Sequence, residues 1–134
     1  MQDQLAIQDA VARMVDAVNR GDFSSATSCF TSEPVIVEDI APFRWTGSSA
    51  VSDWLSAMGA NAALINASGI EMTLMGADRI EVQQGQSYAC FPGNLSLRVE
   101  AGELSAQGTL TCVLVRHGGR WLIDALVWSG PVPM

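Results

Sequence analysis

The order of helical and strand patterns along the chain constrains its fold more than any other feature. Apolar residues recur at three- and four-residue steps between residues 7 and 18, which is the pattern of an amphipathic helix. A second, shorter helix is predicted after Asp22, and a third after Ser48 or Ser49. From Gly69 onward the pattern changes to strands. Helices that precede a run of strands are typical of the α+β class.

The strand segments are separated by short, turn-forming sequences. Apolar and alternating patterns predict strands over residues 70–75, 79–84, 87–100, 104–116 and 120–129. The connections between them, such as Gly85 and His117-Gly118-Gly119, are short enough to join antiparallel neighbours in a meander. One further strand is predicted earlier, over residues 35–40, and an aromatic loop containing Phe43 and Trp45 follows it.

Length and charge limit the number of domains and the class of partner. The chain has 134 residues, of which 49% are hydrophobic, so we expect residues 1–134 to form one domain with its own core. Seven basic residues, all arginine, oppose 14 acidic ones, and the net charge of −7 disfavours nucleic acid as a partner. No apolar stretch approaches the roughly 20 residues of a membrane span, and residues 2–4 are not a basic leader. We therefore predict a cytoplasmic protein that binds neither nucleic acid nor membrane.

The sequence carries no recognisable metal or cofactor motif. Cys29, Cys90 and Cys112 cannot all pair within one chain and show no zinc-type spacing, so they are interpreted as reduced, buried side chains. His117 is the single histidine and lies in a predicted turn, which disfavours a metal site. Nucleotide-binding glycine motifs and the nucleophile elbow of hydrolases are both missing from the sequence. No cofactor and no metal are expected.

Several short motifs, taken in their order along the chain, resemble those of the nuclear transport factor 2-like superfamily, which includes ketosteroid isomerases and SnoaL-like polyketide cyclases. The motifs that carry this resemblance are Asn19-Arg20-Gly21-Asp22, Val37-Glu38-Asp39, Trp45-Thr46-Gly47, Gly108-Thr109-Leu110-Thr111, Gly119-Arg120-Trp121-Leu122-Ile123 and Trp128. Residues 39–47 are most similar to SnoaL-like proteins of unassigned activity. The resemblance implies a cone-shaped, curved antiparallel sheet with three N-terminal helices packed on its concave face, a cystatin-like α+β roll. An apolar cone mouth of this kind is a natural small-molecule site.

Asp39 is the candidate catalytic residue. Side chains alternate along the predicted strand, so Val35, Val37 and Asp39 share one face while Ile36, Glu38 and Ile40 share the other. If the first row lines the cone, burial raises the pKa of the Asp39 carboxyl and suits it to act as a general base. The resemblance places Asp39 where ketosteroid isomerases carry their Asp base. The alternative is a structural carboxylate that accepts hydrogen bonds from the loop over residues 43–47 or pairs with Arg44.

The resemblance also identifies what this chain lacks. Ketosteroid isomerases use a Tyr and a protonated Asp as an oxyanion hole, and the matching positions here are Met14, which cannot donate a hydrogen bond, and a residue near Thr111. Steroid isomerisation is therefore not predicted. The predicted pocket residues, besides Asp39, are Met14, Val37, Phe43, Trp45, Trp54, Thr111, Trp121 and Ile123.

Three functions remain open at this point. The first is a protein that binds a small apolar or polycyclic molecule in the cone, with Asp39 and Trp54 as orienting contacts. The second is a cofactor-independent isomerase- or cyclase-type enzyme in which Asp39 abstracts a proton. The third is a dimeric interaction module whose cone is filled by its own aromatic side chains.

The last predicted strand indicates a partner. Trp121, Ile123, Ala125 and Val127 alternate with Leu122, Asp124, Leu126 and Trp128, so both faces of this strand are largely apolar. One face covers the cone and the other needs a cover of its own. We therefore predict a homodimer that forms through the outer sheet face around Leu126 and Trp128, as the resemblance also implies.

Overall fold

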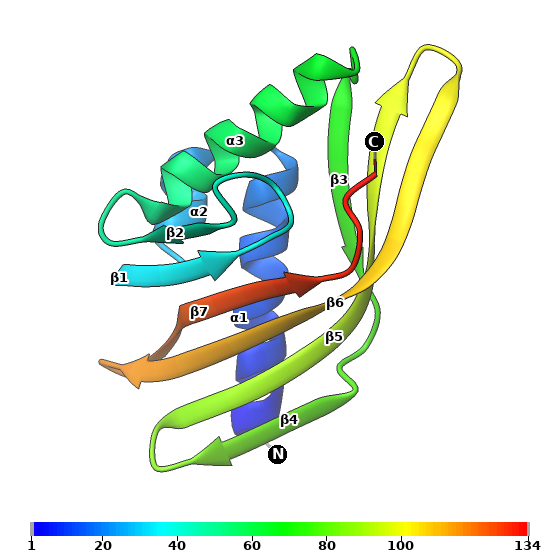
Figure 1. Cartoon of the computed structure of the whole chain (residues 1–134). Coiled ribbons are helices and arrows are strands. Elements are labelled where there is room, and N and C mark those ends of the chain that lie inside the picture. The colour runs from blue at the N-terminus through cyan, green and yellow to red at the C-terminus, as the bar shows by residue number, and fades with distance from the viewer. Residues whose placement is uncertain (1, 134) are drawn as a thin grey trace.

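Three helices lie on one side of a curved sheet in the computed structural model, which describes residues 2–133 (Figure 1). They are α1 (Gln2–Asn19), α2 (Phe23–Thr27) and α3 (Ala50–Leu64). The apolar stripe of α1 buries Ile7, Val11 and Met14 completely. Asp22 caps α2 by accepting hydrogen bonds from the backbone N–H of Ser25 at 3.0 Å and from its hydroxyl at 2.7 Å.

The sheet contains seven strands within the described residues: β1 (Phe30–Val37), β2 (Arg44–Thr46), β3 (Gly69–Leu74), β4 (Arg79–Gln83), β5 (Gln86–Val99), β6 (Gly102–His117) and β7 (Arg120–Ser129). Their order is β2-β1-β7-β6-β5-β3, with β4 also paired to β5. The β1–β7 pair is parallel and every other pair is antiparallel. The predicted α+β cone, with a curved antiparallel sheet behind N-terminal helices, is confirmed.

The sheet bends where two glycines face each other. Gly93 of β5 pairs with Gly108 of β6 in the middle of the longest hairpin, and the indole of Trp128 packs against the Gly108 backbone. A Cβ at position 108 would lie 2.5 Å from Trp128 Cζ2. The missing side chain therefore allows the neighbouring strand to approach closely while the hairpin turns from one end of the cone to the other (Figure 1).

Three strand predictions differ from the structure. β3 and β4 do not form a hairpin with each other, since they lie one after the other along the same edge of β5. The first strand begins at Phe30 and ends at Val37, so it spans Pro34 and leaves Asp39 outside it. The aromatic loop contains a short strand, β2, which pairs with β1. Each of these features depends on pairing with a distant strand, which local periodicity does not report.

The predicted outer-face position of Leu126 and Trp128 is wrong, because a β-bulge reverses the alternation of β7. Val113 pairs with Ala125 but Leu114 pairs with Ile123, so Asp124 is an extra residue in the ladder. Trp121 and Ile123 on one side of the bulge, and Leu126 and Trp128 on the other, all face the core. Leu126 is 0% exposed and Trp128 is 3% exposed.

None of the helices formed by residues 2–133 combines the length and the apolar character needed to cross a membrane.

Candidate functional site

The carboxylate that enters the cone is Glu38, and the prediction that Asp39 faces inward is wrong. Ile36 and Glu38 are 0% and 2% exposed, whereas the Asp39 side chain is exposed. Both rows of the strand are apolar apart from these acids, so its alternation alone does not say which row faces the core. Among residues 2–133, Asp39 makes neither the hydrogen bonds to the following loop nor the ion pair with Arg44 that its structural alternative required.

A turn after β1 fixes the backbone of Glu38. Its N–H donates to the carbonyl oxygen of Phe43 at 3.1 Å, and the N–H of Phe43 donates to the carbonyl oxygen of Ile40 at 2.7 Å. Phe43 has a φ of 75°, and its side chain is 55% exposed and so lies outside the core. The turn therefore directs Glu38 inward and Phe43 outward, and the predicted pocket role of Phe43 is not supported.

The indole of Trp54 on α3 holds one oxygen of the Glu38 carboxyl. Trp54 Nε1 donates to Glu38 Oε1 at 2.6 Å, and the Trp54 side chain is 0% exposed. The second oxygen, Oε2, is buried and has no hydrogen-bond partner among the described residues. Buried carboxyl oxygens are normally satisfied, so an unpaired one is a functional-site signal.

The surroundings of Glu38 favour its protonated form. Burial is the largest effect and raises the pKa of the carboxyl, because a charged group is poorly solvated there. The hydrogen bond from Trp54 acts in the opposite direction, and the nearby negative charge of Asp39 raises the pKa further. The net result is a pKa above the usual Glu value, which brings the group closer to the range in which it exchanges protons at neutral pH.

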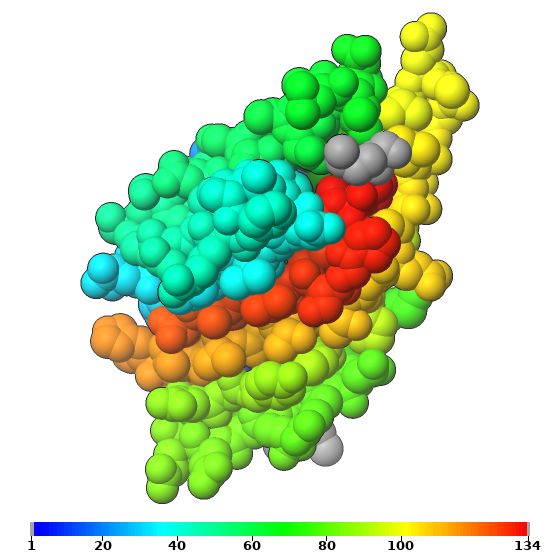
Figure 2. Space-filling model, viewed as in Figure 1, coloured from blue at the N-terminus to red at the C-terminus, as the bar shows by residue number. Residues whose placement is uncertain are grey.

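Glu38 lines a small cavity between α3, β3 and β5. Its volume is about 20 Å³, enough for one water molecule, and most of its wall is apolar. The lining residues are Glu38, Ile40, Met58, Asn61, Ile70, Leu95, Leu97, Val132 and Pro133. The last two belong to the C-terminal segment, which lies beside β6 in Figure 2. The cavity is therefore bounded on one side by a segment outside the helices and strands.

A larger groove adjoins this cavity on its α1 side. It has a volume of about 390 Å³ and is lined by Phe23, Leu55 and the end of α1, together with Met58 and Ile70. Met58 and Ile70 also line the cavity at Glu38. These two side chains therefore separate the buried carboxyl from a hollow of ligand size.

The other residues predicted for the pocket do not line the cavity at Glu38. Met14, Trp45, Trp54, Trp121 and Ile123 are core residues. Val37 and Thr111 are half-buried and belong to the opposite row of their strands from the core residues Ile36 and Cys112. Sequence reasoning did not identify Glu38, Met58 and Ile70 as residues of this cavity.

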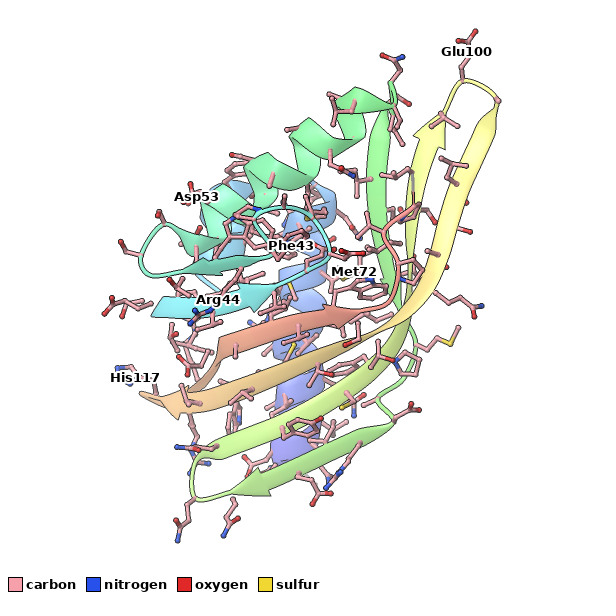
Figure 3. All side chains as sticks on the ribbon, viewed as in Figure 1. Phe43, Arg44, Asp53, Met72, Glu100 and His117 are labelled. Atoms are coloured by element: carbon pink, nitrogen blue, oxygen red, sulfur yellow. The ribbon has the colours of Figure 1, made fainter. Side chains whose placement is uncertain are left out.

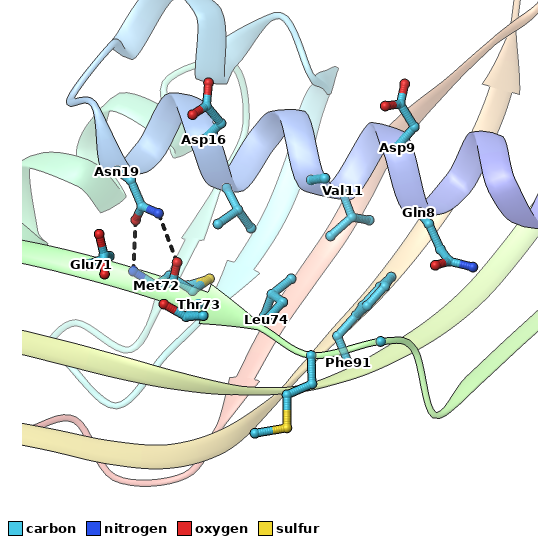
Figure 4. A pocket seen from close by; sticks show the side chains of 14 residues that line it. Gln8, Asp9, Val11, Asp16, Asn19, Glu71, Met72, Thr73, Leu74 and Phe91 are labelled. Carbon is cyan, nitrogen blue, oxygen red and sulfur yellow. Dashed lines mark hydrogen bonds between the residues drawn. The ribbon is translucent and has the colours of Figure 1, made fainter.

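A second groove follows α1 and the free edge of β3 (Figure 4). Its volume is about 660 Å³, and Asp9, Asp16 and Glu71 stand beside an apolar floor formed by Val11, Leu74 and Phe91. Asn19 closes one end: its Nδ2 donates to the carbonyl oxygen of Met72 at 2.8 Å, and its Oδ1 accepts from the N–H of Met72 at 2.8 Å. The two aspartates are paired to Arg13 and Arg20.

Over residues 2–133, no group of three or more His, Cys, Asp or Glu side chains is placed to hold a metal ion. His117 is exposed at the end of β6 (Figure 3). Cys29, Cys90 and Cys112 are free thiols, and burial raises the pKa of Cys112 to about 12. A thiol with so high a pKa is inert as a nucleophile at neutral pH.

Comparison with known proteins gives a family and a set of similar folds. The model of the SnoaL-like domain matches residues 1–127. Curated proteins yield no match.

Solved structures with similar folds include a putative scytalone dehydratase from Novosphingobium aromaticivorans, with a TM-score of 0.80 and 13% identity over 100% of this chain and 91% of that one. A hexachlorocyclohexane dehydrochlorinase (LinA) of type 2 has a TM-score of 0.79 and 14% identity over 99% and 89% of the two chains. A putative dehydratase of the NTF2-like family from Streptomyces avermitilis has a TM-score of 0.79 and 15% identity over 98% and 97%. At these identities the likeness shows the fold.

Proposed function

Because the chain belongs to the SnoaL-like domain family, we propose that it binds a small apolar molecule at the cavity beside Glu38 and that Glu38 exchanges a proton with it. The observation that carries this proposal is the buried, unpaired Oε2 of Glu38 at an otherwise largely apolar cavity. A carboxylate with a raised pKa is a stronger base once ionised, and an apolar surrounding favours transfer of a carbon-bound proton to it. The similar folds named above include proteins described as dehydratases and a dehydrochlorinase, whose names denote elimination reactions.

The ligand needs more room than the cavity offers in this conformation. Met58 is unbranched and flexible, and it stands between the cavity and the groove at Phe23 and Leu55. Rotation of its side chain joins the two spaces into one of ligand size. Displacement of Val132 and Pro133 would open the cavity from the other end. The proposed ligand is therefore a small ring compound that reaches Glu38 past Met58.

Exchange of a carbon-bound proton with deuterated solvent tests this function. A panel of small apolar ring compounds is screened by thermal shift, and each compound that binds is incubated with the protein in deuterium oxide. We expect mass spectrometry to show deuterium uptake with the wild type and uptake at least about 100-fold slower with Glu38→Gln, since a general base contributes at least that factor.

The matched control is Glu33→Gln, which makes the same chemical change on an exposed side chain of β1 and is expected to leave exchange unchanged. Binding without exchange would contradict the role of Glu38 and favour a binding protein without chemistry. If no compound binds, the proposed function is contradicted. The small volume of the cavity then favours the third function, a protein-interaction module whose cone is filled by its own side chains.

The raised pKa of Glu38 also predicts how stability depends on pH. The folded protein holds this proton more tightly than the unfolded chain, whose Glu pKa is near 4.5. Its contribution to the free energy of unfolding is therefore fully present below that value and is lost as the pH rises through the folded pKa. We expect Glu38→Gln to match the wild type near pH 4 and to be more stable by about 1–3 kcal/mol near pH 8. Urea unfolding at both pH values measures the difference, and a constant difference would contradict the prediction.

We also propose that a second copy of the chain covers the outer face of the sheet, with residues different from those first predicted. Val35, Val37, Val113, Ala125 and Val127 are half-buried and adjoin one another across β1, β7 and β6. This row contains no charged side chain, and Figure 1 shows no helix over it. Such a continuous apolar strip is typical of an isologous dimer interface.

Sedimentation velocity tests the dimer. The wild type is expected to be dimeric at micromolar concentration, and Val113→Arg is expected to raise the dissociation constant at least about tenfold by placing a charge at the centre of the interface. Ser105→Arg adds the same side chain to an exposed outer position of β6 and is expected to leave the dimer intact. A monomeric wild type removes the proposal.

A further inference from the structure

A hollow between α1, α2 and the start of β7 concentrates the positive charge of an otherwise acidic chain. Its volume is about 370 Å³, and three of the seven basic residues, Arg13, Arg20 and Arg120, line it. Arg13 lies on α1 and Arg20 directly follows the last residue of that helix, while Arg120 comes from the opposite wall, at the start of β7. Asp16 is the one carboxylate in the lining.

The three guanidinium groups differ in whether they form ion pairs within the chain. Arg13 lies 3.0 Å from Asp9, and Arg20 lies 3.0 Å from Asp16 and 3.3 Å from Asp22. Arg120 has no carboxylate partner within residues 2–133 and is exposed. A planar guanidinium presents five donors in a fork that matches two oxygens of one anion. Arg120 is therefore available to a ligand without breaking an existing ion pair.

The floor of the hollow includes an aromatic side chain and a thiol. Trp121 forms part of it and is 7% exposed, and the guanidinium of Arg116 stands 5.6 Å from the centroid of the Trp121 ring. Cys29 is a second floor residue. Burial raises the pKa of its thiol, while the charges of Arg13 and Arg120 both act to lower that pKa. Two arginines from opposite walls therefore act on the same point of the floor.

We propose that this hollow is a binding site for a small organic oxyanion, a carboxylate or a phosphate whose charged end meets Arg120 and Arg13 and whose apolar part lies on Trp121. Ser25 and Ser28 add little to recognition, because their hydroxyls already donate to Asp22 and to the carbonyl oxygen of Ser25 at 2.7 Å. Recognition therefore depends on the guanidinium groups, and bidentate Arg contacts are the strong form of this interaction. The site shares no residue with the cavity at Glu38 and only Arg20 with the groove beside that cavity, and neither Arg120 nor Trp121 lines either space.

The test is a titration of the ¹⁵N-labelled protein with sodium benzoate and, separately, with sodium phosphate, with sodium chloride added to keep the ionic strength constant. We expect saturable shifts of the amide signals of Cys29, Arg120 and Trp121 with a dissociation constant near 1 mM for at least one of the two anions. The anion that saturates identifies the ligand as a carboxylate or a phosphate. Benzyl alcohol carries the ring without the charge and is expected to produce no saturable shift at these signals.

Two matched variants decide whether Arg120 carries the binding. Arg120→Gln is expected to weaken binding at least about tenfold, whereas Arg98→Gln removes an exposed arginine from β5 and is expected to leave the dissociation constant unchanged. Shifts that do not saturate with either anion overturn the proposal, and so does equal weakening by both variants. If Arg120→Gln loses anion binding but keeps proton exchange at Glu38, the proposed function is unaffected. If Glu38→Gln loses proton exchange but keeps anion binding, the oxyanion site is unaffected.

Discussion

Replacing Trp54 with alanine is expected to lower the free energy of unfolding by about 3–5 kcal/mol, the range for deleting a large aromatic side chain from a core. Trp54 is 0% exposed and belongs to the central core cluster. Its removal leaves a void between α3 and the sheet, and it leaves both oxygens of the Glu38 carboxyl without a partner. Urea unfolding near pH 7 measures the loss, and a change below about 1 kcal/mol would contradict the role given to this side chain.

Trp54→Phe separates the two contributions. Phenylalanine keeps much of the aromatic packing but cannot donate to Glu38 Oε1. The loss in the free energy of unfolding is therefore expected to be smaller than in Trp54→Ala and to include the contribution of the hydrogen bond. Because this bond holds the pKa of Glu38 down, its removal is expected to raise that pKa further. The destabilisation by Trp54→Phe should therefore shrink at low pH, where the carboxyl is protonated in both proteins. The loss in Trp54→Ala is expected to persist at low pH, since most of it comes from packing.

The second large effect is expected from Gly108→Ala. A methyl group at this position would lie 2.5 Å from the carbonyl oxygen of Ser129 and 2.5 Å from Trp128 Cζ2. The first of these atoms belongs to the backbone of β7, so relief requires a strand to move and not a side chain to rotate. We expect a loss of about 3 kcal/mol or more in the free energy of unfolding, at the upper end of the range for overpacked cores.

Gly59→Ala is the matched control for this substitution. Gly59 lies inside α3, and apart from its chain neighbours and the nearby backbone of the same helix, a methyl group there meets no heavy atom within 4 Å. Alanine is the better helix former by about 1 kcal/mol, so the same chemical change is expected to stabilise the protein at residue 59 and to destabilise it at residue 108. Differential scanning calorimetry of the two variants measures whether each substitution raises or lowers the transition temperature. Equal transition temperatures would contradict the close approach at Gly108.

The helices and long strands of this fold are predictable from the sequence because their patterns are long. The period of α1 and the extents of β5, β6 and β7 agree with the structure to within two residues. The phase of β7 was not predictable, because its residues are apolar on both faces and either alternation is self-consistent. Only pairing with β6 makes Asp124 the extra residue and moves Leu126 and Trp128 into the core.

The inward-facing carboxylate was predicted one residue away from its position in the structure for the same reason. Glu38 and Asp39 are adjacent acids at the end of a strand whose two rows are both apolar, so periodicity does not choose between them. The choice is made by Trp54, sixteen positions further along, whose indole N–H can reach one carboxyl but not the other. A donor-bearing aromatic on the apolar face of α3 was visible in the sequence. Its need for a buried acceptor indicates that one of the two acids faces the core, and the structure shows that this acid is Glu38.

The contact between Asn19 and Met72 affects whether the edge of this sheet can pair with strands of other molecules. β3 is an edge strand, and an edge with free N–H and carbonyl groups is a template on which strands of other molecules can add without limit. The carboxamide of Asn19 mimics a neighbouring peptide group and occupies both groups of Met72. An incoming strand would have to break two hydrogen bonds before it gained any at this residue, so one side chain of the first helix disfavours strand addition at this point of the edge.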